Sequence, residues 1–328
     1  MLNIYDLIHE WLMQQALLPF LYFMNWMGFA DDADLVIDWV MLGCLQIIII
    51  ALIMRPLEKD EATFYQPSDQ SQVSWVKDIR QATRIDIFYS CIHRLGVFQF
   101  AFFYFFSGVF FSIGSLLHDQ GFLRFNVELW IPGVTSIPIV SFLIYLVLFD
   151  FIDYGYHRVS HRFNWWWKLH ALHHSQRHLT SWSDNRNHLL DDVFRAFIFS
   201  GFGLFLGVLP GQFLLLMVTS RLIQSWQHGF YPYHFRLLKY VIVTPNFHRY
   251  HHAIGLGYEV PGKPGVLGGC NFGVLFPWWD MLFKTAVFDE SYYPSGVKDY
   301  LPPNHVFLQQ WFGIQKSWQT IFSNKRSR

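Results

Sequence analysis

The chain has 328 residues and a formal net charge of zero, and it is 52% hydrophobic, 20% aromatic and only 15% charged. This balance of charge excludes the basic footprint of a nucleic-acid-binding protein. So few charges and so many aromatic side chains indicate that lipid solvates part of the chain.

Long apolar segments follow one another along the chain. Residues 35–54 and 95–117 are each long enough to cross about 30 Å of hydrocarbon, and residues 11–28 and 134–152 are further predicted spans. The segment 193–226 has Leu-Pro-Gly at its middle, which predicts two short helices that form a hairpin. The span nearest the N-terminus has no basic region before it and no clear cleavage site, so we interpret it as an anchor rather than a signal peptide.

The distribution of lysine and arginine predicts the orientation in the membrane. Residues 55–94, 157–195 and 228–328 contain 22 of the 24 lysines and arginines. By the positive-inside rule these segments are cytoplasmic, and residues 118–136 face the opposite side. The three cysteines form no CxxC pair and no disulfide framework, which also favours a reducing compartment for the soluble parts.

The helix predicted over 134–161 changes character along its length. It is apolar up to Phe149, and then Asp153, His157 and His161 recur every four residues. Residues with this spacing share one helix face, so a single stripe is expected to leave the bilayer as a carboxylate and continue as two metal ligands. We expect Asp153 to accept a hydrogen bond from the distal nitrogen of a ligating imidazole. An ordinary interfacial charge is the alternative.

Twelve of the 16 histidines lie between positions 157 and 252. Eight of them form an HxxxH motif and two HxxHH motifs, and each motif has helical spacing that points its rings to one side. His188 and His228 are single histidines that lie between the motifs. Three such faces that converge predict a metal centre, because neutral imidazole is the commonest metal ligand in proteins. The candidate metal ligands are His157, His161, His170, His173, His174, His188, His228, His248, His251 and His252.

The last HxxHH motif is predicted to lie on a short helix. Thr244 can cap its start, Pro245 suits its first position, and Gly255 suits the residue just beyond its end. The rings of the three histidines are then expected to share one face of this helix.

The ligand set favours a dinuclear centre. Ten imidazoles are too many for one ion, but they suit two ions with about four to six ligands each. The chain has no HExxH motif, so the metalloprotease arrangement is unsupported. An all-nitrogen site suits redox-active iron, and affinity alone does not exclude zinc or copper. Asp191 and Asp192, close to His188, are weaker candidates for a hydrogen bond to a ligating imidazole.

These motifs resemble a known family. The HxxxH motif at 157–161, the HxxHH motifs at 170–174 and 248–252, and the sequence NFGVLFPWWDMLFKT at 271–285 are similar to the fatty acid hydroxylase/sterol desaturase superfamily, over roughly 145–288. The resemblance implies a non-haem di-iron enzyme that uses O2 and two electrons to hydroxylate or desaturate an unactivated C–H bond.

The resemblance also assigns residues. It implies that the eight histidines of the three motifs are catalytic ligands and that His228 matches a further family histidine. Many relatives have His-Pro where this chain has His188 and Leu189, which weakens that match. Lys284 stands where relatives usually have glycine.

We therefore expect an all-α protein, a multi-pass integral membrane helical bundle with a cytoplasmic histidine-rich helical cap that holds a dinuclear metal site. Residues 1–133 are expected to form membrane helices and a cytoplasmic loop, 134–288 the catalytic domain, and 289–328 a cytoplasmic tail. The membrane is expected to be the bacterial inner membrane, or the endoplasmic reticulum if the source is eukaryotic.

The expected function is hydroxylation of a lipid, either an acyl chain, a sterol or another isoprenoid, with two iron ions as cofactor and O2 as co-substrate. Zinc is a possible occupant of the purified protein. The chain has no fused haem-binding segment and no GxGxxG motif, so a separate electron donor is expected: a ferredoxin, a cytochrome b5-type protein or a reductase. A desaturase or an ether-lipid-cleaving monooxygenase would share every motif. A non-catalytic membrane metal-binding protein would instead place its ligands along the spans.

Overall fold

The computed structural model describes residues 33–59, 72–120, 127–132, 137–208 and 210–323. Over these residues the protein is mostly helical, with one two-stranded sheet, which confirms the helical class. The expected span 11–28 lies outside the described residues.

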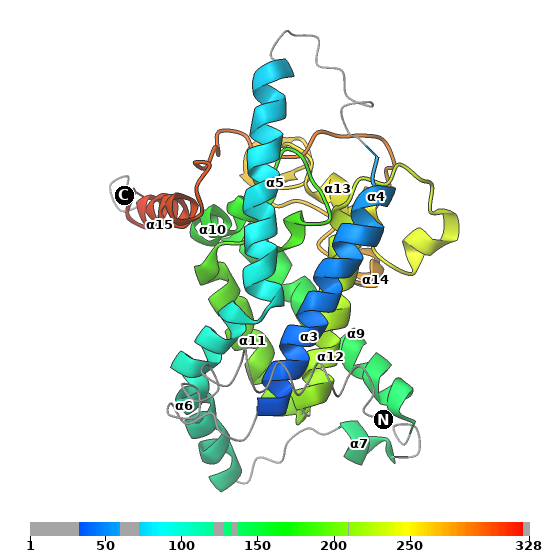
Figure 1. Ribbon diagram of the computed structural model, residues 1–328, viewed down its shortest axis with the longest axis vertical. Coiled ribbons are helices and arrows are strands. Elements are labelled where there is room, and N and C mark those ends of the chain that lie inside the picture. The colour runs from blue at the N-terminus through cyan, green and yellow to red at the C-terminus, as the bar shows by residue number, and fades with distance from the viewer. Residues whose placement is uncertain (1–32, 60–71, 121–126, 133–136, 209, 324–328) are drawn as a thin grey trace, which may run out of the picture.

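Long helices that run side by side form the body of the molecule (Figure 1). They are α3 (Ala33–Ile49), continued by the π-helical turn η3 (Ile50–Met54) and by α4 (Arg55–Leu57), then α5 (Gln72–Arg94), α6 (Val97–Asp119), α9 (Pro138–Arg162), α11 (Leu189–Leu206) and α12 (Pro210–His228). A single helical turn, α7 (Val127–Trp130), precedes α9. Helix α9 packs against α11 and α12, and α3 packs against α5 and α12.

Two of these helices are long and apolar enough to cross a membrane, Val36–Leu57 and Pro138–Arg162. A further pair, Val97–Phe106 and Gly108–Gly114, meets the same test together but is bent by 48° at its break. Two of the three spans predicted in this part of the chain thus correspond to single helices that meet the test, and 95–117 meets it only if the bent pair counts as one span.

The predicted hairpin is present as α11 and α12. The chain leaves α11 through Gly207, whose φ of 67° lies in the left-handed region that favours glycine. The ring of Phe149 on α9 lies 5.6, 5.4 and 5.5 Å from those of Phe199, Phe202 and Phe213. Aromatic packing at these distances fixes both arms of the hairpin to α9.

Shorter elements gather at one end of the long helices and form a cap (Figure 1). They are α10 (Asn164–His174), η5 (Ser183–Asn185), η6 (Arg236–Tyr240), α13 (Pro245–His251), the antiparallel strands β1 (Glu259–Val260) and β2 (Lys263–Leu267), and α14 (Trp278–Leu282). The last helix, α15 (Val306–Ser323), lies across the direction of the long helices and packs against α10. The segment expected to be only a tail therefore contributes a packed helix.

Buried ion pairs attach α5 to the loop that follows α10. The Nε atom of Arg186 lies 2.6 Å from Oδ1 of Asp86, and Nη2 of Arg94 lies 2.8 Å from Oδ2 of Asp184. All four side chains are buried, and a buried ion pair depends strongly on the presence of both partners. These pairs hold the loop that leads from α10 to α11 in place.

Candidate metal centre

The histidines of the cap come from four helix ends that meet. Helix α9 supplies His157 and His161 one turn apart, and α12 supplies His228 as its last residue. Helices α10 and α13, with the residue that caps α13, supply the two HxxHH motifs. The structure thus brings together nine of the ten candidate ligands: His157, His161, His170, His173, His174, His228, His248, His251 and His252.

The local structure of α13 follows the sequence prediction. The Thr244 hydroxyl caps the helix and accepts a hydrogen bond from the backbone N–H of Phe247 at 3.4 Å, and Pro245 is the first helical residue. Gly255 has a φ of 79° shortly after the helix end. The expectation of one common face holds only in part, because His251 and His252 point to different neighbours.

The nine histidines divide into two groups. Within each group the candidate ligand atoms lie within 4.8 Å of one another. The first group is His157, His161, His170 and His174, and the second is His173, His228, His248 and His252. The Nε2 atom of His251 lies 2.9 Å from that of His157, which adds it to the first group. The adjacent histidines of each HxxHH motif therefore serve different groups.

Hydrogen bonds fix the tautomers of two rings that face each other. The Nδ1–H of His157 donates to the backbone carbonyl of Phe272 at 2.9 Å, and that of His251 donates to the carbonyl of Cys270 at 2.7 Å. Because a carbonyl oxygen can only accept, each neutral ring carries its proton on Nδ1 and a lone pair on Nε2. Two Nε2 lone pairs 2.9 Å apart repel unless a cation lies between them.

Two other rings have the same tautomer. The Nδ1–H of His170 donates to the Asp191 carboxylate at 2.9 Å, and that of His228 donates to the Gln224 carbonyl at 2.8 Å. The Nε2 atom of His170 is buried without a hydrogen-bond partner. Each group therefore contains rings whose free lone pair points at the other rings of the group.

The spacing of the nitrogens suits coordination of one ion by each group. The Nε2 atoms of His161 and His174 are 3.1 Å apart in the first group. In the second, the distances from His173 to His228, from His228 to His248 and from His248 to His252 are 3.3, 3.1 and 3.1 Å. Two nitrogens about 2.0–2.1 Å from one ion, at angles of roughly 90° to 109°, lie about 2.9–3.4 Å apart. The residues present therefore fit a pair of metal ions.

Burial favours the neutral form of most of these imidazoles. It lowers the pKa of His251 to about 3. Burial, reinforced by the neighbouring imidazoles, also lowers the pKa values of His173, His174, His248 and His252 well below the usual value. Neutral imidazole is the form that binds a metal, so the cluster is prepared for metal binding near neutral pH.

The acidic residues near the cluster differ from expectation. Asp191 accepts a hydrogen bond from the ring of His170, the role considered for it from sequence. Asp153 instead pairs with Arg195, whose Nε lies 2.9 Å from Oδ1, and in the described part of the chain no histidine lies within hydrogen-bond distance of Asp153. Asp192 bonds Asn187 at 3.1 Å and lies 3.3 Å from Nε2 of His93, which belongs to neither histidine group.

His188 lies apart from both groups. Its Nδ1 accepts a hydrogen bond from the backbone N–H of Leu190 at 3.1 Å, which caps α11. Its Nε2 donates to the carbonyl of Gln310 on α15 at 2.8 Å. Both ring nitrogens are thus engaged by the protein, and the histidine joins α11 to α15.

The residues of the closing sequence 271–285 act behind the ligands, a role that the sequence analysis missed. The Asp280 carboxylate accepts the backbone N–H groups of Phe272 and Gly273 at 2.9 and 2.6 Å. This anchors the loop whose carbonyls orient His157 and His251. Lys284 has a φ of 58°, in the left-handed region that favours glycine. Asp280, which directly follows two tryptophans, was the feature of the sequence that could have indicated this role.

A cavity of about 550 Å³, measured with its open mouth, is lined by histidines of both groups. His157 and His170 of the first group and His173 and His228 of the second face it. A small molecule in this cavity would lie against both candidate metal positions.

Two buried histidine groups that could each hold a metal ion, at the end of helices long and apolar enough to cross a membrane, suggest a membrane metalloprotein. Residues 142–285 match the family model described as fatty acid hydroxylase. This match supports the fatty acid hydroxylase/sterol desaturase superfamily, which the histidine motifs of the chain resemble.

Curated relatives agree with this assignment. The chain is 29% identical over 140 residues to the ornithine lipid hydroxylase OlsE of Rhizobium tropici, which covers 43% of this chain and 40% of the relative. It is 24% identical over 183 residues to an alkylglycerol monooxygenase of Xenopus tropicalis, which covers 54% and 39% of the two chains. An alkylglycerol monooxygenase of Caenorhabditis elegans is 29% identical over 136 residues, with 42% and 25% covered. The matches thus span less than half of each relative. No solved structure matches significantly.

Proposed function

We propose that the protein is a membrane-bound non-haem di-iron monooxygenase that hydroxylates a C–H bond of a lipid with O2 and two electrons from a separate donor. The observation that carries this proposal is the pair of histidine groups whose free Nε2 lone pairs face one another. Iron bound there would supply the redox chemistry that activates O2. The lipid hydroxylase and monooxygenase names of the relatives support a lipid substrate.

The proposal assigns roles to the residues of the site. One iron would be held by the first group with His251, and the second by the second group. Asp191 would keep His170 in the tautomer that presents Nε2 to the metal. The carbonyls of Cys270 and Phe272 would do the same for His251 and His157.

The relatives also favour a second candidate within the same chemistry. Alkylglycerol monooxygenase is the name of two of them, which supports cleavage of an ether lipid. Hydroxylation of the carbon next to an ether oxygen and hydroxylation of an acyl chain need the same metal site. Desaturation is a further outcome of hydrogen removal at that site, and the products distinguish the three.

The test uses labelled oxygen. Membranes that contain the protein are supplied with heavy-isotope O2 and a reductant, and the extracted lipids are analysed by mass spectrometry. We expect one labelled oxygen atom in a lipid product, and none with the His252→Ala variant. The control variant His305→Ala, at an exposed residue outside both groups, should give the wild-type product. A lipid that loses two hydrogens without gaining label would instead indicate a desaturase.

The orientation proposed is multi-pass, with the cap in the cytoplasm and the inner membrane of a bacterium as the favoured location. The lysine and arginine asymmetry supports it. Reporter fusions after Leu117 and after Arg328 should report opposite sides of the membrane. The same side for both would overturn the topology and with it the cytoplasmic site.

A further inference from the structure

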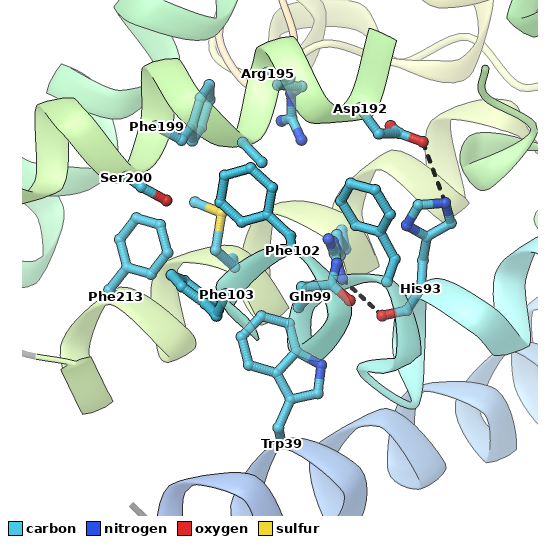
Figure 2. Close-up of a pocket in the computed structure, with 14 residues that line it drawn as sticks. Trp39, His93, Gln99, Phe102, Phe103, Asp192, Arg195, Phe199, Ser200 and Phe213 are labelled. Atoms are coloured by element: carbon cyan, nitrogen blue, oxygen red, sulfur yellow. Dashed lines mark hydrogen bonds and ion pairs between the residues drawn. The ribbon is translucent and has the colours of Figure 1, made fainter. Parts of the chain in front are cut away.

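A second cavity lies among α3, α6, α11 and α12, and Figure 2 shows the side chains that line it. The space inside it, with its open mouth, is about 510 Å³. Its apolar wall is mostly aromatic and includes Phe102, Phe103, Phe199 and Phe213. These rings suit a hydrocarbon chain.

The aromatic cavity adjoins the cavity at the histidines. Asp192 and Arg195, one turn apart on α11, line both of them. Figure 2 shows both side chains at the edge of the aromatic cavity, on the side away from Trp39. The cavity at the histidines is called the metal chamber below. A ligand that fills the aromatic cavity would reach the metal chamber at this turn of α11.

Polar side chains line one side of the aromatic cavity. In Figure 2, His93, Gln99 and Asp192 lie on this side, opposite Phe103 and Phe213. The cavity is thus amphipathic, with its polar side next to the turn of α11 that leads to the metal chamber.

Arg221 supplies a positive charge to this polar side. Its Nη1 donates to the backbone carbonyl of His93 at 3.0 Å, and its guanidinium lies 5.7 Å over the ring of Trp39. With the Gln99 amide turned so that its oxygen faces Arg221, that oxygen accepts from the guanidinium as well. Within the described ranges no carboxylate lies within ion-pair distance of Arg221.

The other charged groups at the cavity have partners of their own. Arg195 is paired with Asp153, and Asp192 is bonded to Asn187 and lies 3.3 Å from Nε2 of His93. Arg221 is thus the guanidinium of this cavity whose direct partners are all uncharged.

We infer that the cavity binds an anionic lipid, with its carboxylate or phosphate on Arg221 and its hydrocarbon chain along the phenylalanines. A guanidinium binds either anion through paired N–H donors, and the cavity excludes much of the water that would weaken that contact. The aromatic wall would contact the hydrocarbon chain, and Arg221 would bind the head group.

This binding mode adds a substrate class to the proposed function. What it implies for the reaction rests on that proposed function. Arg221 precedes His228 by about two turns on α12, a rise of roughly 10 Å. A head group on Arg221 therefore leaves the first half of a long chain nearest the metal chamber. Oxidation is expected in the half of the chain that carries the head group.

The test measures lipid binding on the metal-free protein in non-ionic detergent. The probes are dibromostearate and the matching uncharged alcohol, because bromine quenches tryptophan fluorescence and Trp39 lines the cavity. The part of the quenching that is lost in a Trp39→Phe variant measures binding in this cavity alone. We expect the carboxylate to bind at least about tenfold more tightly than the alcohol, since a hydrogen bond to a charged group contributes this much.

Variants of Arg221 test whether this residue causes the preference for the carboxylate over the alcohol. Arg221→Gln should bind the two probes equally, Arg221→Lys should retain part of the preference, and Arg84→Gln, at an exposed arginine on α5, should match the wild type. If Arg221→Gln does not fold, the comparison of acid with alcohol on the wild type still decides.

Three results would overturn the inference: equal binding of both probes by the wild type, a carboxylate preference that survives Arg221→Gln, or displacement of dibromostearate by inorganic phosphate at matched concentration, which would indicate a site for free anions. Product analysis adds a fourth, oxygen placed in the methyl half of the chain. Lipid binding without any turnover would contradict the proposed function but leave this binding site intact.

Discussion

Replacement of Asp191 by asparagine is expected to weaken metal binding. The Asp191 carboxylate accepts hydrogen bonds from the rings of His170 and Trp166 at 2.9 and 2.7 Å and from the Tyr156 hydroxyl. Asparagine has nearly the same shape, but it has no charge and one of its two terminal atoms only donates. The hydrogen bond that fixes the His170 tautomer is therefore weakened or lost.

The size of the effect follows from the charge on the acceptor. A hydrogen bond to a charged group contributes about 1.5–3 kcal/mol, which corresponds to a change in binding constant of about 10- to 150-fold. Loss of an acceptor behind a metal-ligating histidine reduces affinity by about 10- to 100-fold in other metal sites. We therefore expect a loss of about 10- to 100-fold for one of the two ions.

The assay is competition between the purified protein and a chelator of known affinity. Asp192→Asn is the matched control, because Asp192 bonds Asn187 and approaches His93 but contacts none of the clustered histidines. Its metal affinity should equal that of the wild type. Equal losses in the two variants, or no loss in Asp191→Asn, would refute the role assigned to Asp191.

Replacement of His252 with alanine should lower metal content and abolish product formation without changing membrane insertion, whereas alanine at the exposed His305 should change neither; metal and lipid analysis of both variants checks this. Asp86→Ala leaves Arg186 buried without its carboxylate, so the free energy of unfolding should fall by about 3–5 kcal/mol. Thermal unfolding in detergent measures it, and an unchanged midpoint would contradict it. The metal-free protein should lose stability as the pH falls below about 6.5, because His251, with a pKa of about 3 when folded, gains its proton only on unfolding. Urea midpoints between about pH 8 and pH 5 test this, and a flat profile would count against it.

The sequence predicts the local features of this site well. The cap of Thr244 on α13 and the four-residue spacing of His157 and His161 on α9 depend on residues within a turn or two of each other. Such short-range patterns are readable because helix geometry alone fixes which side chains share a face.

Features that depend on tertiary contacts could not be predicted. The rings of His251 and His252 point to different groups because His157 lies beside one and His248 beside the other. Asp153 meets Arg195, which is 42 residues away along the chain, instead of an imidazole. No local pattern distinguishes these outcomes.

The position of His188 illustrates the same limit. Its place before α11 resembles that of a family ligand, yet its Nε2 is used by Gln310, which is 122 residues away. The contact exists because α15 folds back onto α10, and the amphipathic character of this last helix was not recognised in a segment expected to be a tail.

The central claim is that each histidine group holds one iron and that both are needed. Its most direct test is a titration of metal-free protein with ferrous iron, in which bound iron per chain and lipid oxidation are measured together. Activity should rise with added iron and reach its maximum at two ions per chain. Full activity with one ion per chain, or with zinc alone, would contradict it.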